Sequence, residues 1–345
     1  NSSTAVADTQ APTIPVNVKA IAASSSQINI SWSAATDNVG VAGYKVYRNG
    51  SQIASTTATS YSSIGLTAAT SYSYRVVAYD AAGNNSGQSI SSSATTAAIS
   101  ASCLPAPKTT LIVNVRDRGA TGNGSTNDTA AIQAAINQVA VTGGTVLVPD
   151  GTYIIDALTR LYVKSNVTFR MTSGAVLKAI PNGSANYGIL RVENASNVNI
   201  VGGKIQGERS QHKGTSGQWG QGVEIYASNN VVVEGVTSVD NWGDGFYIGK
   251  NSSKLTFCSV VADNNRRMGL SIISANGVLI KNSIFKNTKG QYPYSGFDIE
   301  PNIGDNVNDV QLVNSQFHNN EGSGIELAFP ADQGPSASLV TNVTI

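Results

Sequence analysis

The sequence predicts an all-β protein in which an N-terminal β-sandwich precedes a parallel β-helix. Short alternating strands separated by turn residues fill the stretch from Ala11 to about Thr96. A helical pattern follows near Ala130, and from Gln221 onward one strand pattern recurs at nearly constant spacing. Repeats of roughly 20 to 50 residues are typical of solenoids, in which each turn buries its apolar face against the next.

Composition argues against nucleic-acid and membrane partners. The 345 residues include 22 Lys and Arg against 21 Asp and Glu, so the chain has no net field that attracts polyanions. No run of about 18 apolar residues occurs, so no membrane span is expected. The chain starts at Asn1 with neither Met nor an apolar leader. A secreted, extracellular protein looks this way after loss of its signal peptide, and so does a trimmed chain.

The first domain is expected over residues 11–96. Its clearest strands are Gln27–Trp32, Gly43–Arg48 and Ser71–Tyr79. Such strands suit a β-sandwich, in which Trp32 is a candidate for the buried tryptophan and Leu66 with Tyr72 for a tyrosine corner. Together with Ala78–Ser86, these features resemble a bacterial fibronectin type III domain. The resemblance implies a bacterial protein with a spacer or weak carbohydrate-contacting module.

Residues 97–108 are rich in Ala, Ser and Pro and are interpreted as a linker. Cys103 in this stretch and Cys258 far along the chain are the two cysteines. They can form one disulfide or remain two free thiols, and the spacing does not decide between these alternatives.

The second domain, residues 109–345, is expected to open with a short helix. Asp128 or Thr129 can cap it. Three apolar residues then follow at helical spacing, Ile132, Ile136 and Val139. The order of Val115–Thr129, helix and the strands from Gly143–Ile155 resembles the opening of the pectate-lyase-like superfamily. That resemblance implies a right-handed parallel β-helix with a capping α-helix, but no particular reaction.

The repeated element is a strand with the pattern Gly-apolar-x-apolar, which occurs five times. The copies are Gln221–Ile225, Asp244–Ile248, Met268–Ile272, Ser295–Ile299 and Ser323–Leu327. Their glycines lie 23, 24, 27 and 28 residues apart. A second strand follows each of the first four copies: Asn230–Val233, Lys254–Phe257, Gly277–Ile280 and Asp309–Leu312. We expect the asparagines after it to form a structural amide ladder, namely Asn241, Asn264, Asn287 and Asn319.

Alternation along the repeated strand predicts which side chains face a substrate. The two apolar residues point inward, so the x residue points outward. Stacked coils then form an exposed row with members about 4.8 Å apart: Glu224, Tyr247, Ser271, Asp298 and Glu326. A polar row on a flat parallel sheet suits a long polymer.

Three acids on this exposed face are the candidate catalytic residues. Asp298 and Glu300 share a strand face, and Asp244 starts a strand two coils earlier. Crowded carboxylates raise the pKa of at least one member, and glycoside hydrolysis needs a protonated acid beside an ionised one. We expect Asp298 and Glu300 to be the general acid and the base or nucleophile, with Asp244 as a third acid. The competing interpretation is that these acids only provide solubility.

Residues near these acids are expected to bind the sugar. Arg266 and Arg267 suit a uronate carboxylate, unless they pair with the protein's own Asp244 or Asp298. The insertion at 207–220 can wall the cleft, with its tryptophan stacked on a pyranose ring or packed on the coil instead. The predicted substrate-binding set is Arg266, Arg267, Tyr247, His212, Trp219, Glu224 and Glu326.

Two motifs resemble known active sites, each incompletely. Asp244-Gly-Phe resembles the active-site strand starts of polygalacturonase-type hydrolases. Gly296-Phe-Asp298, after Tyr292 and Tyr294, resembles the site of mannuronan epimerases, although Ile299–Asn302 lacks their histidine. These resemblances imply an enzyme that cleaves a polysaccharide. Hydrolysis, which requires no cofactor, is slightly favoured because acids outnumber nearby lysines.

Two alternatives remain open. The first is a lyase or C5-epimerase of uronate polymers such as pectate or alginate. Lyases of this superfamily use Arg or Lys as base and often Ca²⁺ held by Asp and Glu, and Arg266, Arg267, Lys250 and the acid row offer such groups. The second is a non-catalytic glycan-binding matrix protein. The sequence does not decide whether a metal binds.

The sequence stops at Ile345 in a second strand, with no recognisable cap. A bare coil end would expose apolar rungs and unpaired backbone groups. We therefore expect self-association, another partner or further chain to cover it.

Overall fold

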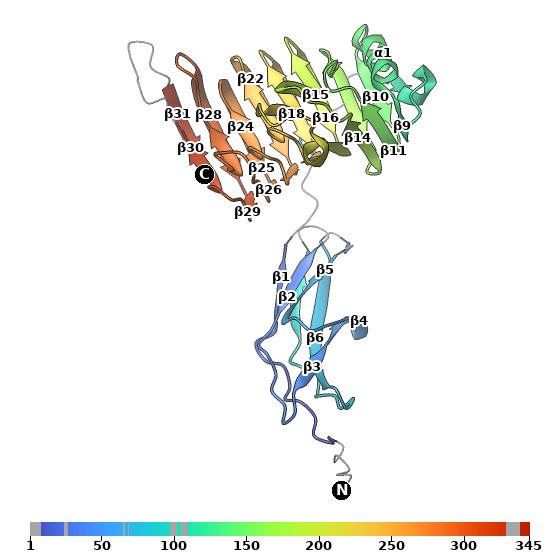
Figure 1. Cartoon of the computed structure of the whole chain (residues 1–345), viewed down its shortest axis with the longest axis vertical. Coiled ribbons are helices and arrows are strands. Elements are labelled where there is room, and N and C mark those ends of the chain that lie inside the picture. The colour runs from blue at the N-terminus through green and yellow to red at the C-terminus, as the bar shows by residue number, and fades with distance from the viewer. Residues whose placement is uncertain are drawn as a thin grey trace. The chain divides into compact units, whose positions relative to one another are not determined.

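The computed structural model describes residues 8–23, 27–64, 66–67, 69–96, 102–104, 110–328 and 339–345. The chain divides into two compact units, residues 1–101 and residues 102–345 (Figure 1). Each unit has its own hydrophobic core. No helix in the described residues is both long and apolar enough to cross a membrane.

The first unit is the predicted antiparallel sandwich. One sheet has the order β1-β2-β5, with β1 (Lys19–Ala22), β2 (Ile28–Ser31) and β5 (Ser60–Ser63). The other has the order β4-β3-β6-β7, with β3 (Val41–Arg48), β4 (Ser51–Thr56), β6 (Ser71–Asp80) and β7 (Ser92–Thr95). Trp32 is buried edge-on against Tyr44, and the Thr67 backbone N–H donates to the Tyr72 hydroxyl at 3.0 Å. The predicted core tryptophan and tyrosine corner are therefore confirmed.

The second unit opens with a short 3₁₀ helix (Val115–Arg118) and helix α1 (Thr129–Ala140), the latter as predicted. The buried face of α1 contributes Ile132, Ile136 and Val139 to the β-helix core. Asp128 takes the N-cap position, but its carboxylate makes no cap hydrogen bond. It accepts instead from the backbone N–H groups of Thr121 and Gly122, which ties the helix start to the preceding loop.

The coils stack into three parallel sheets, whereas the sequence indicated two strands in each coil. The sheet that carries the predicted row, called the site sheet below, contains β12 (Leu161–Val163), β15 (Asn186–Glu193), β18 (Trp219–Tyr226), β21 (Phe246–Gly249), β24 (Leu270–Ile272), β27 (Phe297–Ile299) and β30 (Ile325–Leu327). The second contains β8 (Ile112–Asn114), β10 (Gly144–Val148), β13 (Val167–Met171), β16 (Ser196–Val201), β19 (Asn229–Glu234), β22 (Ser252–Cys258), β25 (Ala275–Lys281), β28 (Asn306–Val313) and β31 (Leu339–Thr344).

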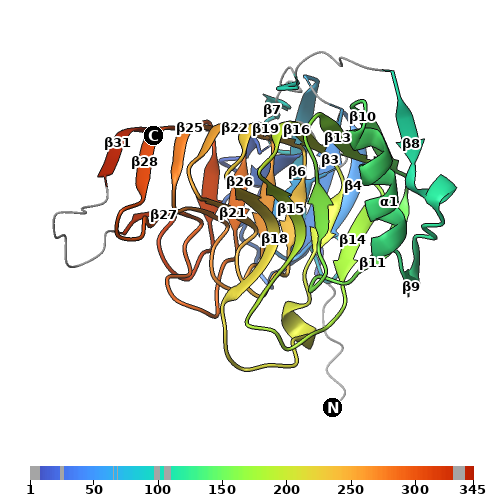
Figure 2. The same cartoon turned by 90° about the horizontal axis from the view of Figure 1, so that it is seen from above.

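The third sheet contains β9 (Asn123–Asn127), β11 (Gly151–Ile155), β14 (Ala175–Ala179), β17 (Lys204–Gln206), β20 (Thr237–Val239), β23 (Val261–Asp263), β26 (Ile284–Lys286) and β29 (Gln316–His318). Most of its later strands span three residues, too few for an alternation pattern to show in the sequence. Figure 2 shows the coils succeeding one another from α1 to β31.

The predicted strand register is correct. Phe246, Leu270 and Phe297 pair in successive coils and are fully buried in the core. Phe246 also meets Phe257 of the second sheet edge-on, with ring centroids 5.7 Å apart. Apolar side chains from the sheets thus meet inside the coil, and the intervening residues of the site sheet are left on its outer face.

Close backbone approach explains the glycines of the first four repeats. A Cβ placed on Gly245 would lie 2.7 Å from the carbonyl oxygen of Gly269, the glycine of the next coil. A Cβ on Gly296 would lie 2.8 Å from the carbonyl oxygen of Gly324. These distances leave no room for a methyl group, so the glycines are required for stacking rather than for an unusual φ.

The predicted asparagine ladder forms only in part, because these side chains bond to neighbouring aspartates rather than to one another. Asp240, Asn264, Asn287 and Asn319 all have positive φ, a conformation that Asn and Asp tolerate well. Asn264 donates to Asp240 and Asn287 donates to Asp263, each at 2.7 Å. Asn241 does not belong to this set. It lies one residue further on, fully buried, where its amide donates to Asn265 at 2.7 Å.

The two cysteines form a disulfide, which resolves the alternative that the sequence left open. Cys103 bonds to Cys258 at the end of β22. The Glu234 carboxylate, on neighbouring β19, accepts from the Cys103 backbone N–H at 2.8 Å and from the Ser102 hydroxyl at 3.0 Å. Residues 102–104, which the sequence placed in a linker, are therefore attached to the β-helix.

Candidate active site

The predicted row lies on the outer face of the site sheet. Backbone pairing aligns Glu224, Tyr247, Ser271, Asp298 and Glu326 in successive coils. The expectation that these side chains are open to solvent is wrong for several of them. Glu224, Ser271 and Asp298 are buried, and so is Asp244 at the start of its coil. Facing outward from a sheet is not the same as exposure, because neighbouring side chains and loops cover the sheet.

Arg267 joins two of the three candidate acids. Its guanidinium donates from Nη1 to Asp244 at 3.2 Å and from Nη2 to Glu300. The Ser271 hydroxyl donates to the same Asp244 carboxylate at 2.8 Å. Burial lowers the pKa of Arg267, but Asp244 and Glu300 outweigh it and raise the pKa above its ordinary value. Arg267 therefore pairs with the protein's own carboxylates, the alternative that the sequence left open, and its contact with a substrate stays a prediction.

Asp298, the third candidate acid, is not paired with Arg267. It has no exposed surface, and neither of its oxygens has a hydrogen-bond partner among the described residues. Burial raises its pKa to about 8, with Glu300 and Glu326 adding to the rise and Arg267 opposing it. Burial also raises the pKa of Asp244, to about 6, against the opposing effects of Arg267 and Ser271. Asp298 is thus the acid of this group that keeps its proton at neutral pH.

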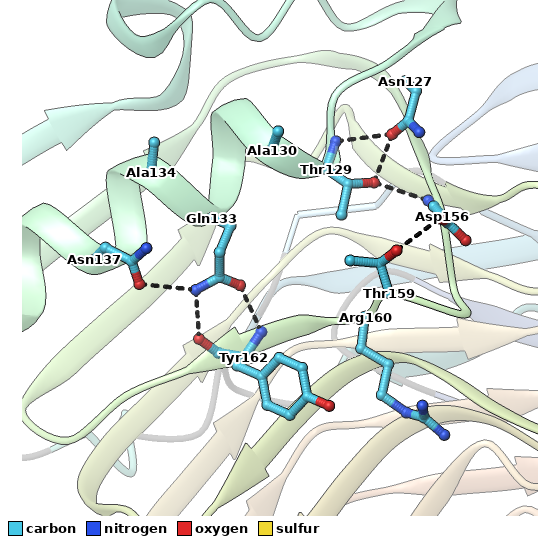
Figure 3. Close-up of a pocket in the computed structure, with 10 residues that line it drawn as sticks. All are labelled: Asn127, Thr129, Ala130, Gln133, Ala134, Asn137, Asp156, Thr159, Arg160 and Tyr162. Carbon is cyan, nitrogen blue, oxygen red and sulfur yellow. Dashed lines mark hydrogen bonds between the residues drawn. The ribbon is translucent and has the colours of Figure 1, made fainter.

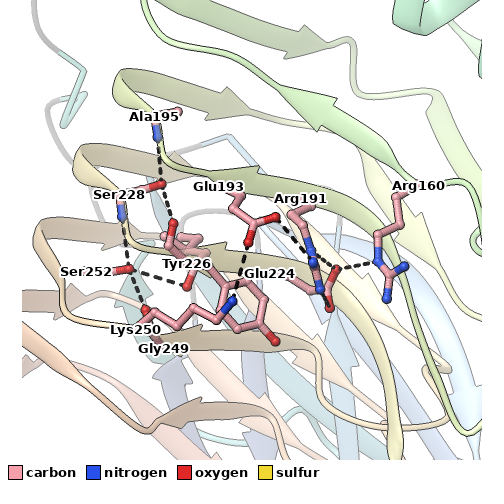
Figure 4. Close-up of polar contacts among 11 residues, drawn as sticks. Arg160, Arg191, Glu193, Ala195, Glu224, Tyr226, Ser228, Gly249, Lys250 and Ser252 are labelled. Atoms are coloured by element: carbon pink, nitrogen blue, oxygen red, sulfur yellow. Dashed lines mark hydrogen bonds and ion pairs between the residues drawn. The ribbon is translucent and has the colours of Figure 1, made fainter. Parts of the chain in front are cut away.

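Glu224, predicted to bind substrate, lies in a separate ion-pair cluster (Figure 4). It accepts from Arg160 Nε at 3.1 Å and from Arg191 Nη2 at 2.8 Å, and its side chain is 1% exposed. Arg191 also contacts Glu193 at 3.4 Å and lies over the ring of Tyr226. Two arginines occupy this carboxylate, so Glu224 offers no free oxygen in this arrangement, and its predicted sugar contact stays a prediction.

The insertion at 207–220 folds around a buried histidine. The side chain of His212 has no exposed surface, and its Nδ1 lies 2.9 Å from the Glu208 carboxylate. Tyr187 donates its hydroxyl to the same carboxylate, and the His212 ring stacks on Trp242 with centroids 3.9 Å apart. His212 therefore anchors the insertion, and its predicted contact with a sugar stays a prediction.

Arg266 anchors the other side of this stack. Its guanidinium lies 3.8 Å from the centroid of the Trp242 ring. It donates to the Gly217 carbonyl and to Gln291 Oε1, each at 3.0 Å. The predicted clamp residue thus connects the insertion to the loop of a later coil.

Besides Arg266, three more of the predicted binding residues keep some exposure. Trp219, at the start of β18, is 44% exposed. Tyr247 is half-buried and tilts against Tyr226. Glu326 is partly exposed and accepts from the Ser295 hydroxyl. With Glu300, whose side chain is 25% exposed, they form the accessible part of the predicted site.

Comparison with known proteins identifies the second unit. Residues 112–344, more than half of the chain, match the family model described as rhamnogalacturonase A/epimerase, pectate lyase-like. The chain belongs to this family. Residues 10–95 match the fibronectin type III domain, so both family resemblances of the sequence are confirmed.

Relatives of this pectate-lyase-like chain share only parts of it. An α-amylase of Niallia circulans is 53% identical over 94 residues, which are 27% of this chain and 7% of that protein. The uncharacterized protein YclG of Bacillus subtilis (strain 168) is 28% identical over 242 residues, with 61% of this chain and 41% of that protein covered. The chain therefore spans less than half the length of either relative.

A solved structure shows the fold alone. PfbA, a surface adhesin of Streptococcus pneumoniae, is similar with a TM-score of 0.53 and 18% identity, covering 68% of this chain and 62% of that one. At this identity the likeness extends to the architecture of the pectate-lyase-like unit and not to its site.

Sequence reasoning missed four residues of this pectate-lyase-like site. They are Arg160, Tyr187, Arg191 and Trp242. Leu190-Arg191-Val192 has the same outward x position as the repeat, which was a usable signal. Trp242 had none, because its partners arrive from an insertion 30 residues away in sequence.

The acid row is not where carboxylates gather most closely. In the part of the chain that the structure describes, the one group of three with oxygens within 4.8 Å of one another is Asp8, Asp37 and Asp80 in the sandwich. Glu224 of the row and the neighbouring Glu300 are each paired with an arginine.

Proposed function

We propose that this chain belongs to a secreted bacterial enzyme that degrades a polysaccharide by hydrolysing glycosidic bonds with Asp298 and Glu300. One observation carries the proposal, namely the unequal state of two neighbouring acids. Asp298 is buried with unpartnered oxygens and a pKa raised to about 8, whereas Glu300 is paired with Arg267 and partly exposed. A protonated acid beside an ionised one is what glycoside hydrolysis requires.

Each residue then has a defined role. Asp298 gives its proton to the leaving oxygen, and Glu300 activates water or attacks the anomeric carbon. Arg267 pairs with Glu300 and orients its carboxylate, and Asp244 with Ser271 holds Arg267 in place. Because Asp298 has no exposed surface, substrate binding has to open a path to it. The partly exposed Trp219 and Tyr247 offer rings for sugar stacking.

The ion pairs disfavour β-elimination. A lyase needs an Arg or Lys that can accept a proton, but Arg267 is paired with two carboxylates and Arg266 with a carbonyl, an amide and a ring.

Activity on a panel of neutral and uronic polysaccharides, with mass spectrometry of the products, tests the proposal. Hydrolysis yields new reducing ends without the ultraviolet absorbance of an unsaturated uronate, whereas β-elimination yields that absorbance. Asp298→Asn should lower turnover by about 100-fold or more. Lys281→Ala, on β25 of the second sheet, is the control and should leave the rate unchanged. Equal activity of Asp298→Asn and wild type would remove Asp298 from the mechanism. Glycan binding without any product would instead support the matrix-protein alternative.

A further inference from the structure

A pocket of about 580 Å³ lies between helix α1 and the first strand of the site sheet (Figure 3). It is lined by Asn127, Thr129, Ala130, Gln133, Ala134, Asn137, Asp156, Thr159, Arg160 and Tyr162. This volume is in the range of small-molecule sites, which run from roughly 300 to 1,000 Å³.

The pocket is preformed by contacts between the helix and the strand. Gln133 of α1 accepts from the Tyr162 backbone N–H at 2.8 Å and donates to the Tyr162 carbonyl at 3.1 Å. The same amide donates to Asn137 one turn later at 3.1 Å. A side chain bonded to both backbone groups of one strand residue fixes the spacing between α1 and β12, so the pocket needs no rearrangement to form.

The chemistry of the walls suits a polyhydroxylated ring better than an ion. Both charged residues are engaged, since Arg160 pairs with Glu224 and Asp156 accepts from Thr159 and from the Leu158 backbone N–H. The polar groups of the pocket that remain available to a ligand are largely neutral. The amide nitrogens of Asn127 and Asn137 have no hydrogen-bond partner within the described chain. The ring of Tyr162 is 38% exposed beside the small side chains of α1. An aromatic face with neutral amide donors is a common way to bind a pyranose.

Tyr162 also belongs to the row of the site sheet. Backbone pairing connects it through Arg191, Glu224, Tyr247 and Ser271 to Asp298. Five coil-to-coil steps of about 4.8 Å place it roughly 24 Å from Asp298, on the same face. A polymer extended along the coils from the acids would therefore reach this pocket.

We propose that the pocket beside α1 is a distal sugar-binding site, which takes a pyranose unit of the polysaccharide chain whose reacting unit lies at Asp298 and Glu300. The link between the pocket and the catalytic acids rests on the proposed function. The binding of a sugar in the pocket does not depend on that function, and it is measured separately from activity. The consequence is a preference for chains long enough to span both places.

Affinity gel electrophoresis of the full chain tests the binding step, with polygalacturonate, alginate, galactomannan and arabinoxylan as probes. Tyr162→Ala should weaken retardation by the best-binding polymer about 5-fold, as expected for loss of a ring contact. Asn137→Ala changes the helix side of the pocket and should also weaken retardation. It keeps the test valid if the Tyr162→Ala variant does not fold. Lys164→Ala is the matched control, because this exposed residue follows β12 without lining the pocket. The proposal is overturned if both variants are retarded as strongly as the wild type. It is also overturned if no polymer retards the wild type.

Kinetics on a polymer that the wild type degrades test the link to catalysis. Tyr162→Ala should raise KM for long chains with kcat unchanged, and should not affect oligosaccharides too short to span the row. If Tyr162→Ala weakens retardation but the wild type degrades none of the polymers, the proposed hydrolysis is refuted and the sugar site is supported. An equal loss of kcat/KM on long and short chains would refute a distal site.

Discussion

Replacing Asp298 with asparagine should stabilise the fold at alkaline pH and leave it almost unchanged in acid. The side chain is fully buried, both oxygens lack partners in the described structure, and the pKa is raised to about 8. A raised pKa means that the folded state holds the proton more tightly than the unfolded state does. The stability contributed by protonated Asp298 is thus fully present below about pH 4 and is lost as pH rises through about 8. Asparagine is nearly isosteric and cannot ionise, so it avoids this loss.

The size of the effect follows from the two pKa values. A rise from 3.8 to about 8 at about 1.36 kcal/mol per pH unit gives a ceiling on the order of 5 kcal/mol. For a unit of this length each kcal/mol moves the melting temperature by roughly 2 to 4 °C. The variant should therefore melt on the order of 10 °C above wild type at pH 9 and within a few degrees of it at pH 4.

Thermal unfolding of both proteins from pH 4 to pH 9 measures this difference directly. Asp309→Asn provides the control for replacing an aspartate by an asparagine as such, because Asp309 is exposed on the surface. If the difference in melting temperature between Asp298→Asn and wild type does not change with pH, Asp298 ionises freely in the folded protein. The assignment of Asp298 as the protonated acid would then be wrong.

Three further outcomes follow from the fold. Phe297→Ala should cost roughly 3 to 5 kcal/mol in chemical denaturation because it leaves a cavity in the core, and a cost below 1 kcal/mol would contradict the inward register. Gly245→Ala should destabilise by about 1 to 3 kcal/mol in the same assay, because its methyl group would lie 2.7 Å from the Gly269 carbonyl oxygen. A chain beginning at Ser102 should fold and keep its turnover on a soluble substrate, since the candidate acids lie in the second unit. Loss of activity in the folded shorter chain would show that the sandwich takes part in catalysis.

Periodicity in the sequence was sufficient for the fold and for the direction of each side chain in the site sheet. The repeated glycines marked the coils, and alternation placed Phe297 inward and Asp298 outward, as observed. These features depend on residues near one another in the repeat, which is why one sequence reveals them. The asparagine ladder was displaced by one residue at Asn241, because Asp240 has a similar polar side chain and takes the same conformation.

Burial and pairing were not predictable in the same way. Alternation assigns a face but says nothing of what covers it, so Glu224 and Asp298 were expected to be open to solvent. One partner of Glu224, Arg160, precedes a strand without a glycine, and the other, Arg191, lies on β15, whose Gly188 pairs with Gln221 and not with the repeat glycine Gly222. His212 was expected to face a sugar, but its position depends on how an irregular insertion folds back onto Trp242. Long-range contacts of this kind are set by tertiary packing rather than by local pattern.

The disulfide described above determines where mechanical force would enter the β-helix. Tension on the chain from the first unit arrives at residue 102 and meets Cys103 one residue later. The covalent route then divides, and the bond to Cys258 carries load directly to β22 in the middle of the stack. Helix α1 and the coils before β22 lie on the longer branch and would be bypassed. When the load leaves the chain beyond Cys258, the early coils and the pocket beside α1 would thus stay relaxed under pulling, whereas reduction of the disulfide would expose them to the full force.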